Sequence, residues 1–87
     1  MMRLVTVQDL QRGRYYRISY SSQKKERVVV YGRFDVVVIH SPGLLKAVAH
    51  YSFTVEDEKG KEFPIQFDLE TLTSPQTQIL EVDCDLA

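Results

Sequence analysis

Basic and tyrosine side chains gather in the first 33 residues of this sequence, in a pattern that suits the binding of nucleic acid. Nucleic-acid grooves on small β-proteins combine cations that follow the phosphates with aromatic rings on which bases stack. Arginine serves both purposes, because its planar guanidinium binds phosphate through two hydrogen bonds and also stacks on rings. The candidate binding residues, for nucleic acid or for a protein partner, are Arg12, Arg14, Tyr15, Arg17, Lys24, Lys25, Arg27 and Arg33.

The distribution of charge gives a second interpretation of the same residues. The first 50 residues hold nine of the 11 Lys and Arg but three of the 12 Asp and Glu, whereas residues 51–87 hold two and nine. The net charge of −1 therefore conceals a basic half and an acidic half. Such asymmetry can mark a polyanion-binding face. If the halves lie side by side in one sheet, cross-strand pairs would instead neutralise the basic face.

The two histidines are too far apart in the expected structure for shared chemistry. A hairpin turn at residues 41–44 would place His50 opposite the neighbourhood of Asp35 and leave His40 near the turn. The histidines would then lie on the order of 15 Å apart along the ladder. We expect a cross-strand contact between His50 and Asp35, and neither a shared metal nor an acid–base pair.

The remaining candidates for catalysis or metal binding are also weak. Cys84, the single cysteine, lies between Asp83 and Asp85, whose negative charges disfavour a reactive thiolate. The acidic run at residues 56–58 lacks the spaced oxygen ligands and fixed glycine of a calcium loop. The sequence contains no nucleophile-elbow, P-loop or zinc-protease motif. We therefore expect no enzymatic activity, no cofactor and no metal site.

A short helical turn is expected to lead into the first strand. Thr6 and Asp9 have the spacing of a capping box, and Gly13 is placed to end the helix in a left-handed conformation. From residue 14 the apolar period changes from helical to two, which is typical of a strand. Tyr16, Ile18 and Tyr20 then share the inner face, and Arg14, Tyr15 and Arg17 form the surface most exposed to a partner.

The rest of the chain is predicted to be strands joined by short turns. Residues 27–40 form one long strand with a bulge or bend at Gly32, and a hairpin tip is expected around Gly60. Pro64 restricts its strand to an edge or a bulge. The expected strands after the first are residues 27–40, 45–56, 62–69 and 79–82, with a turn or short 3₁₀ piece at residues 69–78.

These elements predict a mainly β protein with a single domain over residues 1–87. A sheet of five or six short strands protects its edges best by curling into a small barrel, so we expect an antiparallel SH3-like barrel with a short N-terminal helix. Its expected core is Leu4, Val7, Leu10, Tyr16, Ile18, Tyr20, Val28, Val30, Phe34, Val36, Val38, Phe53, Val55, Phe63, Ile65, Phe67, Leu69 and Leu80.

Two segments carry a resemblance to known families. They are D-L-x-x-G-R-Y-Y-R-I-x-Y at residues 9–20 and E-F-P-I-Q-F-D-L-E-T-L at residues 62–72. Together they resemble SH3-like and Sm-like barrels, and more narrowly the barrels of WYL-type domains and of short phage-encoded proteins. The chain has no tryptophan, so the Trp-Tyr-Leu signature is missing. The resemblance implies an architecture and, by analogy, sensing of a small ligand.

A non-catalytic interaction module is the function that the sequence favours. Residues 36–39 and 44–45 supply more apolar side chains than one thin core can absorb, and the excess would mark a surface for a protein partner or for self-association. The protein would then be an adaptor, an inhibitor or a homodimer. The alternatives are a nucleic-acid-binding barrel that uses the basic first strand, and a small-ligand-sensing barrel. The single cysteine and the lack of a signal peptide or membrane span predict a cytoplasmic protein with no membrane partner.

Overall fold

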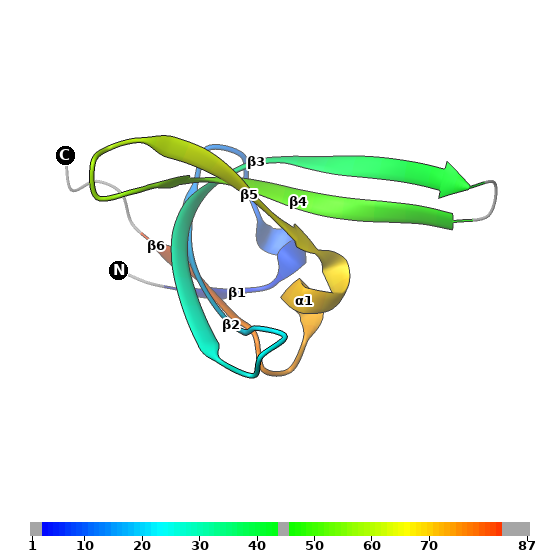
Figure 1. Cartoon of the computed structure of the whole chain (residues 1–87), viewed down its shortest axis with the longest axis horizontal. Coiled ribbons are helices and arrows are strands. Elements are labelled where there is room, and N and C mark those ends of the chain that lie inside the picture. The colour runs from blue at the N-terminus through cyan, green and yellow to red at the C-terminus, as the bar shows by residue number, and fades with distance from the viewer. Residues whose placement is uncertain (1–2, 44–45, 83–87) are drawn as a thin grey trace.

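The computed structural model describes residues 3–43 and 46–82, which form one six-stranded sheet with a short helix (Figure 1). The elements are β1 (Arg3–Val5), the 3₁₀ turn η1 (Val7–Asp9), β2 (Tyr15–Ser21), β3 (Arg27–Gly43), β4 (Lys46–Glu56), β5 (Glu62–Asp68), α1 (Leu69–Thr73) and β6 (Gln78–Val82). The strand order is β1-β6-β2-β3-β4-β5, and every pair of neighbours is antiparallel. The predicted mainly β class is confirmed.

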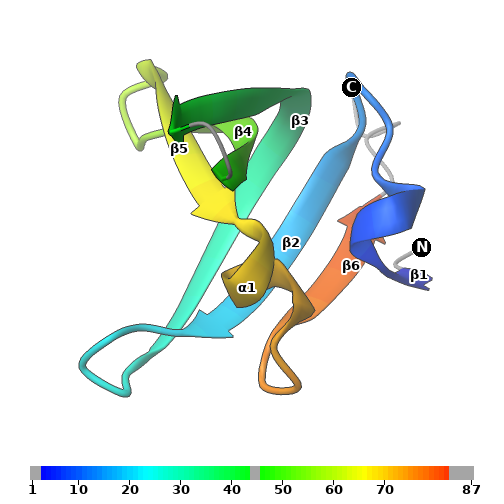
Figure 2. The same cartoon turned by 90° about the vertical axis from the view of Figure 1, so that its right-hand side faces the viewer.

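The sheet is strongly curled but its ends do not meet. Figure 2 shows the strands bent around α1, which contacts β4, β5 and η1. Strands β1 and β5 are the two edges of the sheet, and within the described residues they do not pair with each other. Hydrogen bonds between strands therefore do not close this sheet into a barrel. Pro64 lies in the edge strand β5, as its missing N–H predicts.

The N-terminal segment differs from the predicted helix. The described chain begins with a strand, β1, which pairs with β6. The capping spacing is correct, because the Asp9 carboxylate accepts hydrogen bonds from the N–H of Thr6 at 3.0 Å and from its hydroxyl at 3.1 Å. The element is one 3₁₀ turn that ends at Leu10. Gly13 has the predicted positive φ of 86°, but it shapes the entry into β2, where its N–H donates to the Phe34 carbonyl.

Strand β2 supplies the centre of the core. Tyr16 and Ile18 are completely buried and Tyr20 packs against the core, so the predicted inner face is confirmed. The hydroxyl of Tyr16 accepts a hydrogen bond of 2.8 Å from the N–H of Gln11, which satisfies this polar group in the interior. Among the described residues, the buried apolar ones are Val5, Tyr16, Ile18, Phe34, Phe53, Phe67, Leu72 and Ile79.

Several predicted core residues are exposed, and the reason for Leu4 differs from the reason for Val36 and Val38. For β1 the wrong face of the strand was predicted to be buried. Val5 is buried and pairs with the buried Ile79, while Leu4 pairs with Leu80 and is 64% exposed. On β3, Val36 and Val38 belong to a part of the strand that leaves the body of the protein. The predicted core residues that are exposed are Leu4, Val36, Val38, Phe63 and Leu69. Three buried residues, Val5, Leu72 and Ile79, were not among the predicted core residues.

Strand β3 is one continuous strand, but its irregularity is not at Gly32. Gly32 pairs regularly with Tyr16 on β2 and with Val55 on β4. The register of β3 and β4 shifts between Phe34 and Val36 instead, and again between His40 and Gly43. The turn predicted at residues 41–44 begins later than expected, because residues 41–43 still belong to β3, and residues 44–45 lie outside the described part of the chain.

Helix α1 occupies residues 69–73 of the segment predicted as a turn or short 3₁₀ piece, and a turn follows it at residues 75–76. Asp68 is its N-cap, and its Oδ1 accepts a hydrogen bond of 2.8 Å from the N–H of Thr71. Hydrogen bonding by the Thr71 side chain and backbone lowers the pKa of Asp68 below its ordinary value, and the charge of His50 adds to this effect. The cap holds Leu72 in the opening of the curled sheet, where its side chain is buried.

The Asp68 cap should stabilise the protein more at neutral pH than in acid. Because folding depresses this pKa, the cap stabilises the fold fully above the ordinary value of about 3.9 and loses its effect as the pH falls through the lower, folded value. At pH 7 we expect Asp68→Ala to lower the free energy of unfolding by about 1 kcal/mol and Asp68→Asn to leave it nearly unchanged. Urea unfolding measures both, and the deficit of the alanine variant relative to the native chain should shrink towards pH 3. A deficit that is independent of pH would contradict this role.

Candidate interaction surfaces

Two tyrosines and two arginines form a square on the outer face of β2 and β3. Tyr15 pairs with Arg33 and Arg17 pairs with Tyr31, so each ring has a guanidinium as its cross-strand neighbour. These residues alternate with the buried Tyr16 and Ile18, and therefore face outward. Tyr15 is 39% exposed and Tyr31 is 55% exposed, and we call the four residues the Tyr–Arg square. Its aromatic area is open to solvent, as the prediction for β2 required.

The acidic half of the chain reaches one corner of the Tyr–Arg square. The Nε of Arg33 lies 3.3 Å from the carboxylate of Asp35, and its terminal nitrogen lies 3.7 Å from that of Glu62 on β5. The hydrogen bond to Asp35 is the main reason that the pKa of Arg33 is raised above its ordinary value. Asp35 also accepts a hydrogen bond from the hydroxyl of Thr54. Arg33 is thus held by acids, and Arg17, between Leu80 and Tyr31, is the other cation of the square.

The other predicted binding residues are spread over both ends of the β2–β3 hairpin. Arg12 and Arg14 are exposed in the segment before β2, while Lys24 and Lys25 are exposed in the turn after it. The seven residues of β2 separate these groups by roughly 20 Å. Arg27 begins β3 and donates a hydrogen bond to the carbonyl of Gln76. The eight predicted residues therefore do not form one compact patch.

Part of β3 and β4 projects from the rest of the molecule (Figure 1), and exposed apolar side chains lie on this stretch of β3. Strand β2 pairs with β3 as far as Arg33, and β5 pairs with β4 from His50 onward. Beyond those points, residues 39–43 and 46–49 form a two-stranded ribbon, while Val36–Val38 pair with residues 50–52 of β4, which β5 still covers. We call residues 36–43 and 46–49 together the β3–β4 arm. It extends along the longest dimension of the molecule, which measures 46 Å against 26 and 25 Å for the other two.

Both faces of the β3–β4 arm carry apolar side chains. Val36 and Val38 alternate with Val37 and Ile39, so one pair faces each side of the ribbon. Val36 is 51% exposed and Val38 is 42% exposed, while Val37 is 37% exposed and Ile39 is 71% exposed. No charged residue occurs between residues 36 and 43. A soluble monomer rarely presents such an uninterrupted apolar surface, and its usual role is contact with another molecule.

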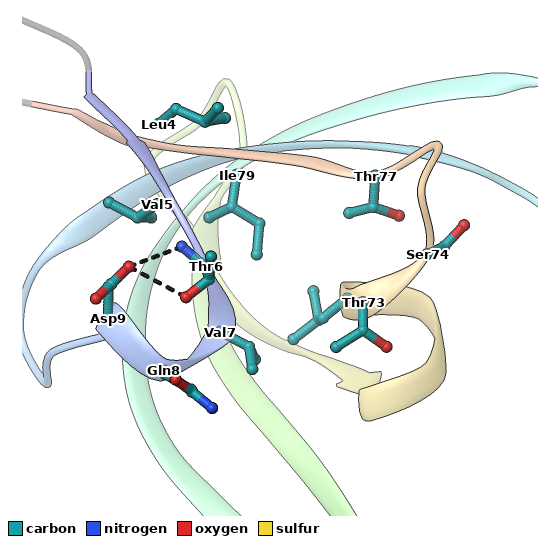
Figure 3. A pocket seen from close by; sticks show the side chains of 11 residues that line it. Leu4, Val5, Thr6, Val7, Gln8, Asp9, Thr73, Ser74, Thr77 and Ile79 are labelled. Carbon is teal, nitrogen blue, oxygen red and sulfur yellow. Dashed lines mark hydrogen bonds between the residues drawn. The ribbon is translucent and has the colours of Figure 1, made fainter.

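A third surface is the open groove between η1 and α1 (Figure 3). Its volume is about 550 Å³, its apolar walls include Leu4, Val5 and Ile79, and hydroxyl groups of Thr73 and Thr77 lie along its rim. Hydrogen bonds from the Thr6 backbone and hydroxyl lower the pKa of Asp9, the carboxylate at one end. This carboxylate is thus already engaged with its own turn, and the groove has no charged group aimed into it among the described residues.

The histidine contact predicted from the sequence is wrong. His50 pairs with Val38 on β3 and with Asp68 on β5, because the β3–β4 ladder continues to Gly43 and Lys46, past the point where the turn was expected to begin. Asp35 is engaged by Arg33 and Thr54 instead. Within residues 3–43 and 46–82, no group of three or more metal-ligating side chains comes together. Cys84 lies outside the described residues.

Comparisons with known proteins do not add to these observations. No family model, curated protein or solved structure matches the chain. Among the described residues, no helix has the length and apolar character needed to cross a membrane.

Proposed function

We propose that this protein is a non-catalytic interaction module that binds a protein partner through the β3–β4 arm. The observation that carries the proposal is the exposure of Val36–Ile39, on both faces of β3, where this strand runs beyond its pairing with β2 into the β3–β4 arm. A two-stranded ribbon is marginally stable in water, and further strands or a packed surface are needed to stabilise it. A partner that covers the arm would supply that surface.

In this proposal the body of the protein, which is the part outside the β3–β4 arm, supports the arm. Its antiparallel sheet curls around α1 in the way expected of an SH3-like barrel whose ends are not joined by strand pairing (Figure 2). In this arrangement the body is a rigid base that is stabilised by its own core, and β3 and β4 continue from it into the arm. A site built on such regular elements is positioned more accurately than one on loops.

Nucleic-acid binding is the second candidate, and the Tyr–Arg square favours it. Two exposed tyrosine rings beside Arg17 resemble a stacking platform, and the turn with Lys24 and Lys25 could follow the backbone of a single strand. The engagement of Arg33 by Asp35 and Glu62 removes one cation from that platform. For this reason we rank the arm ahead of the square.

Affinity capture from a lysate of the source organism tests the two candidates together. We expect the native chain to retain a discrete protein partner, and Val38→Lys to reduce its recovery by at least about tenfold, since a charge would be buried in an apolar interface. Val29→Lys is the matched control, because Val29 is a valine of the same strand with nearly the same exposure, 41% against 42%. Each capture is repeated after nuclease treatment of the lysate.

The outcomes separate the two functions. Recovery that survives Val38→Lys and is lost after nuclease treatment or in Arg17→Glu would contradict the arm and favour nucleic acid. Binding of that kind should also weaken steeply as salt is added, because neutralised phosphates release counterions. Recovery that is equal in all variants would contradict both candidates.

A further inference from the structure

The edge of β3 in the β3–β4 arm lacks the usual protection against strand pairing. Within the described residues, this strand has β4 as its only neighbour from Val36 to Gly43. Natural proteins protect such edges with charged side chains, proline or bulges. From Val36 to Ser41 the sequence contains no proline and no Asp, Glu, Lys or Arg. One irregularity of the β3–β4 ladder comes before this segment and a second lies between His40 and Gly43, so about five residues, from Val36 to His40, remain competent to accept another strand.

We propose that this edge pairs antiparallel with the same edge of a second copy of the chain, which gives a two-fold symmetric dimer. This inference rests on the proposed function of the arm as the interaction surface. The two ribbons would join in the order β4-β3-β3-β4, with the two β3 edges paired at the centre. A four-stranded ribbon of this kind exceeds the minimum of three strands that gives a sheet independent stability.

The residues of the edge favour a second copy over a different partner. An antiparallel pair centred on Val38 would place Val37 of each copy opposite Ile39 of the other, which is a β-branched pair of the kind that stabilises sheets. Because the paired edges belong to the same uncharged segment, self-pairing brings no like charges together. A two-fold contact also uses the same surface on both molecules and closes after two copies, so it does not propagate into fibres.

The expected dimer is weak, because the paired segment is short. Five residues of strand span about 17 Å, and an interface of this extent is at the small end of those that are specific. We therefore expect a dissociation constant in the range of about 1–100 µM, and the measurement has to cover that range.

Sedimentation velocity on the full chain, from about 1 to 500 µM, tests the proposal. The native chain should change from monomer to dimer over this range. Val38→Lys should weaken the dimer by at least about tenfold, because it brings two like charges together near the two-fold axis. Val29→Lys should dimerise as the native chain does, since Val29 lies outside the proposed contact, in the part of β3 that pairs with β2 through Ser19. A native chain that stays monomeric throughout, or a dimer that Val38→Lys leaves unchanged, would overturn the proposal.

Cysteine cross-linking gives a second measurement that does not depend on the folding of a lysine variant. In a Cys84→Ser background, single cysteines at Val37, Val38 and Ile39 are oxidised, and Val29→Cys serves as the control. Cross-linking should be strongest at the position nearest the two-fold axis and weak at position 29, because a disulfide requires Cα atoms within about 7 Å. No cross-link at any of the three arm positions would exclude this pairing.

Failure of this inference can be told apart from failure of the proposed function. A monomeric native chain that still loses a captured partner in Val38→Lys would reject the second copy and keep the arm as a docking surface. A monomer whose capture does not depend on Val38 would reject both. A dimer that cross-links at the arm positions and is broken by Val38→Lys would support both.

Discussion

Replacing Phe53 with alanine is expected to lower the free energy of unfolding by about 3–5 kcal/mol. Phe53 lies on β4, is completely buried, and belongs to the cluster of buried residues that forms the core. Its ring centroid lies 5.2 Å from that of Phe34, 5.7 Å from that of Phe67 and 6.4 Å from that of Tyr16. Alanine would remove the buried area and leave a cavity where these three rings meet.

A phenylalanine of the adjoining strand is the control for the loss of unfolding free energy in Phe53→Ala. Phe63 on β5 is 43% exposed, so Phe63→Ala should cost about 1 kcal/mol or less. Phe53→Leu keeps most of the volume and should cost less than the alanine variant. Urea unfolding followed by circular dichroism measures all three. Equal losses at positions 53 and 63 would mean that Phe53 is not the centre of the core.

A methyl group at position 32 is expected to lower the free energy of unfolding by about 1–3 kcal/mol, although alanine suits a strand better than glycine does. A Cβ atom on Gly32 would lie 3.2 Å from Cβ of Phe53 and 3.3 Å from both the carbonyl oxygen of Thr54 and a methyl group of Val55. The nearest of these atoms belong to the neighbouring strand and to a fully buried side chain, so they cannot move aside without disturbing the core.

Gly43 provides the matched control for this substitution. It lies on the same strand, and a Cβ there would meet no atom within 4 Å. Gly43→Ala should therefore leave stability unchanged or raise it slightly, because alanine has less conformational freedom to lose on folding. If Gly32→Ala is as stable as Gly43→Ala in urea unfolding, the close approach of β3 and β4 at this point is not required.

Local patterns were sufficient to predict most of the strands. The alternation of Tyr16, Ile18 and Tyr20 gave the inner face of β2 correctly, because side chains of a strand point to opposite sides in turn. Gly60 marked the tip of the β4–β5 hairpin, where its φ of 81° is one that glycine adopts readily. These features depend on residues that are neighbours in the sequence, and so the sequence contains the information directly.

The faces of β1 and β6 were predicted wrongly because they depend on register. The sequence analysis placed Leu4 and Leu80 in the core, but their neighbours Val5 and Ile79 are buried instead. A shift of one residue moves every side chain of a strand to the other face. Both strands are short and apolar on both sides, so alternation could not choose between the two registers.

In the candidate interaction surfaces too, some features follow from residues that are neighbours in the sequence, and others depend on residues that are far apart in it. The sequence alone determined that residues 36–39 are an apolar strand without alternation and that Tyr15 and Arg17 face away from the core. Only the tertiary structure decided that β2 ends its pairing with β3 at Arg33 and that β5 begins its pairing with β4 at His50. The first limit leaves Val36 and Val38 on a part of β3 that β2 does not cover, the second leaves residues 46–49 without β5, and the same packing brings Glu62 to Arg33. The reason is physical: whether a strand is covered depends on where its neighbours in the sheet end, and those neighbours lie far away in the sequence.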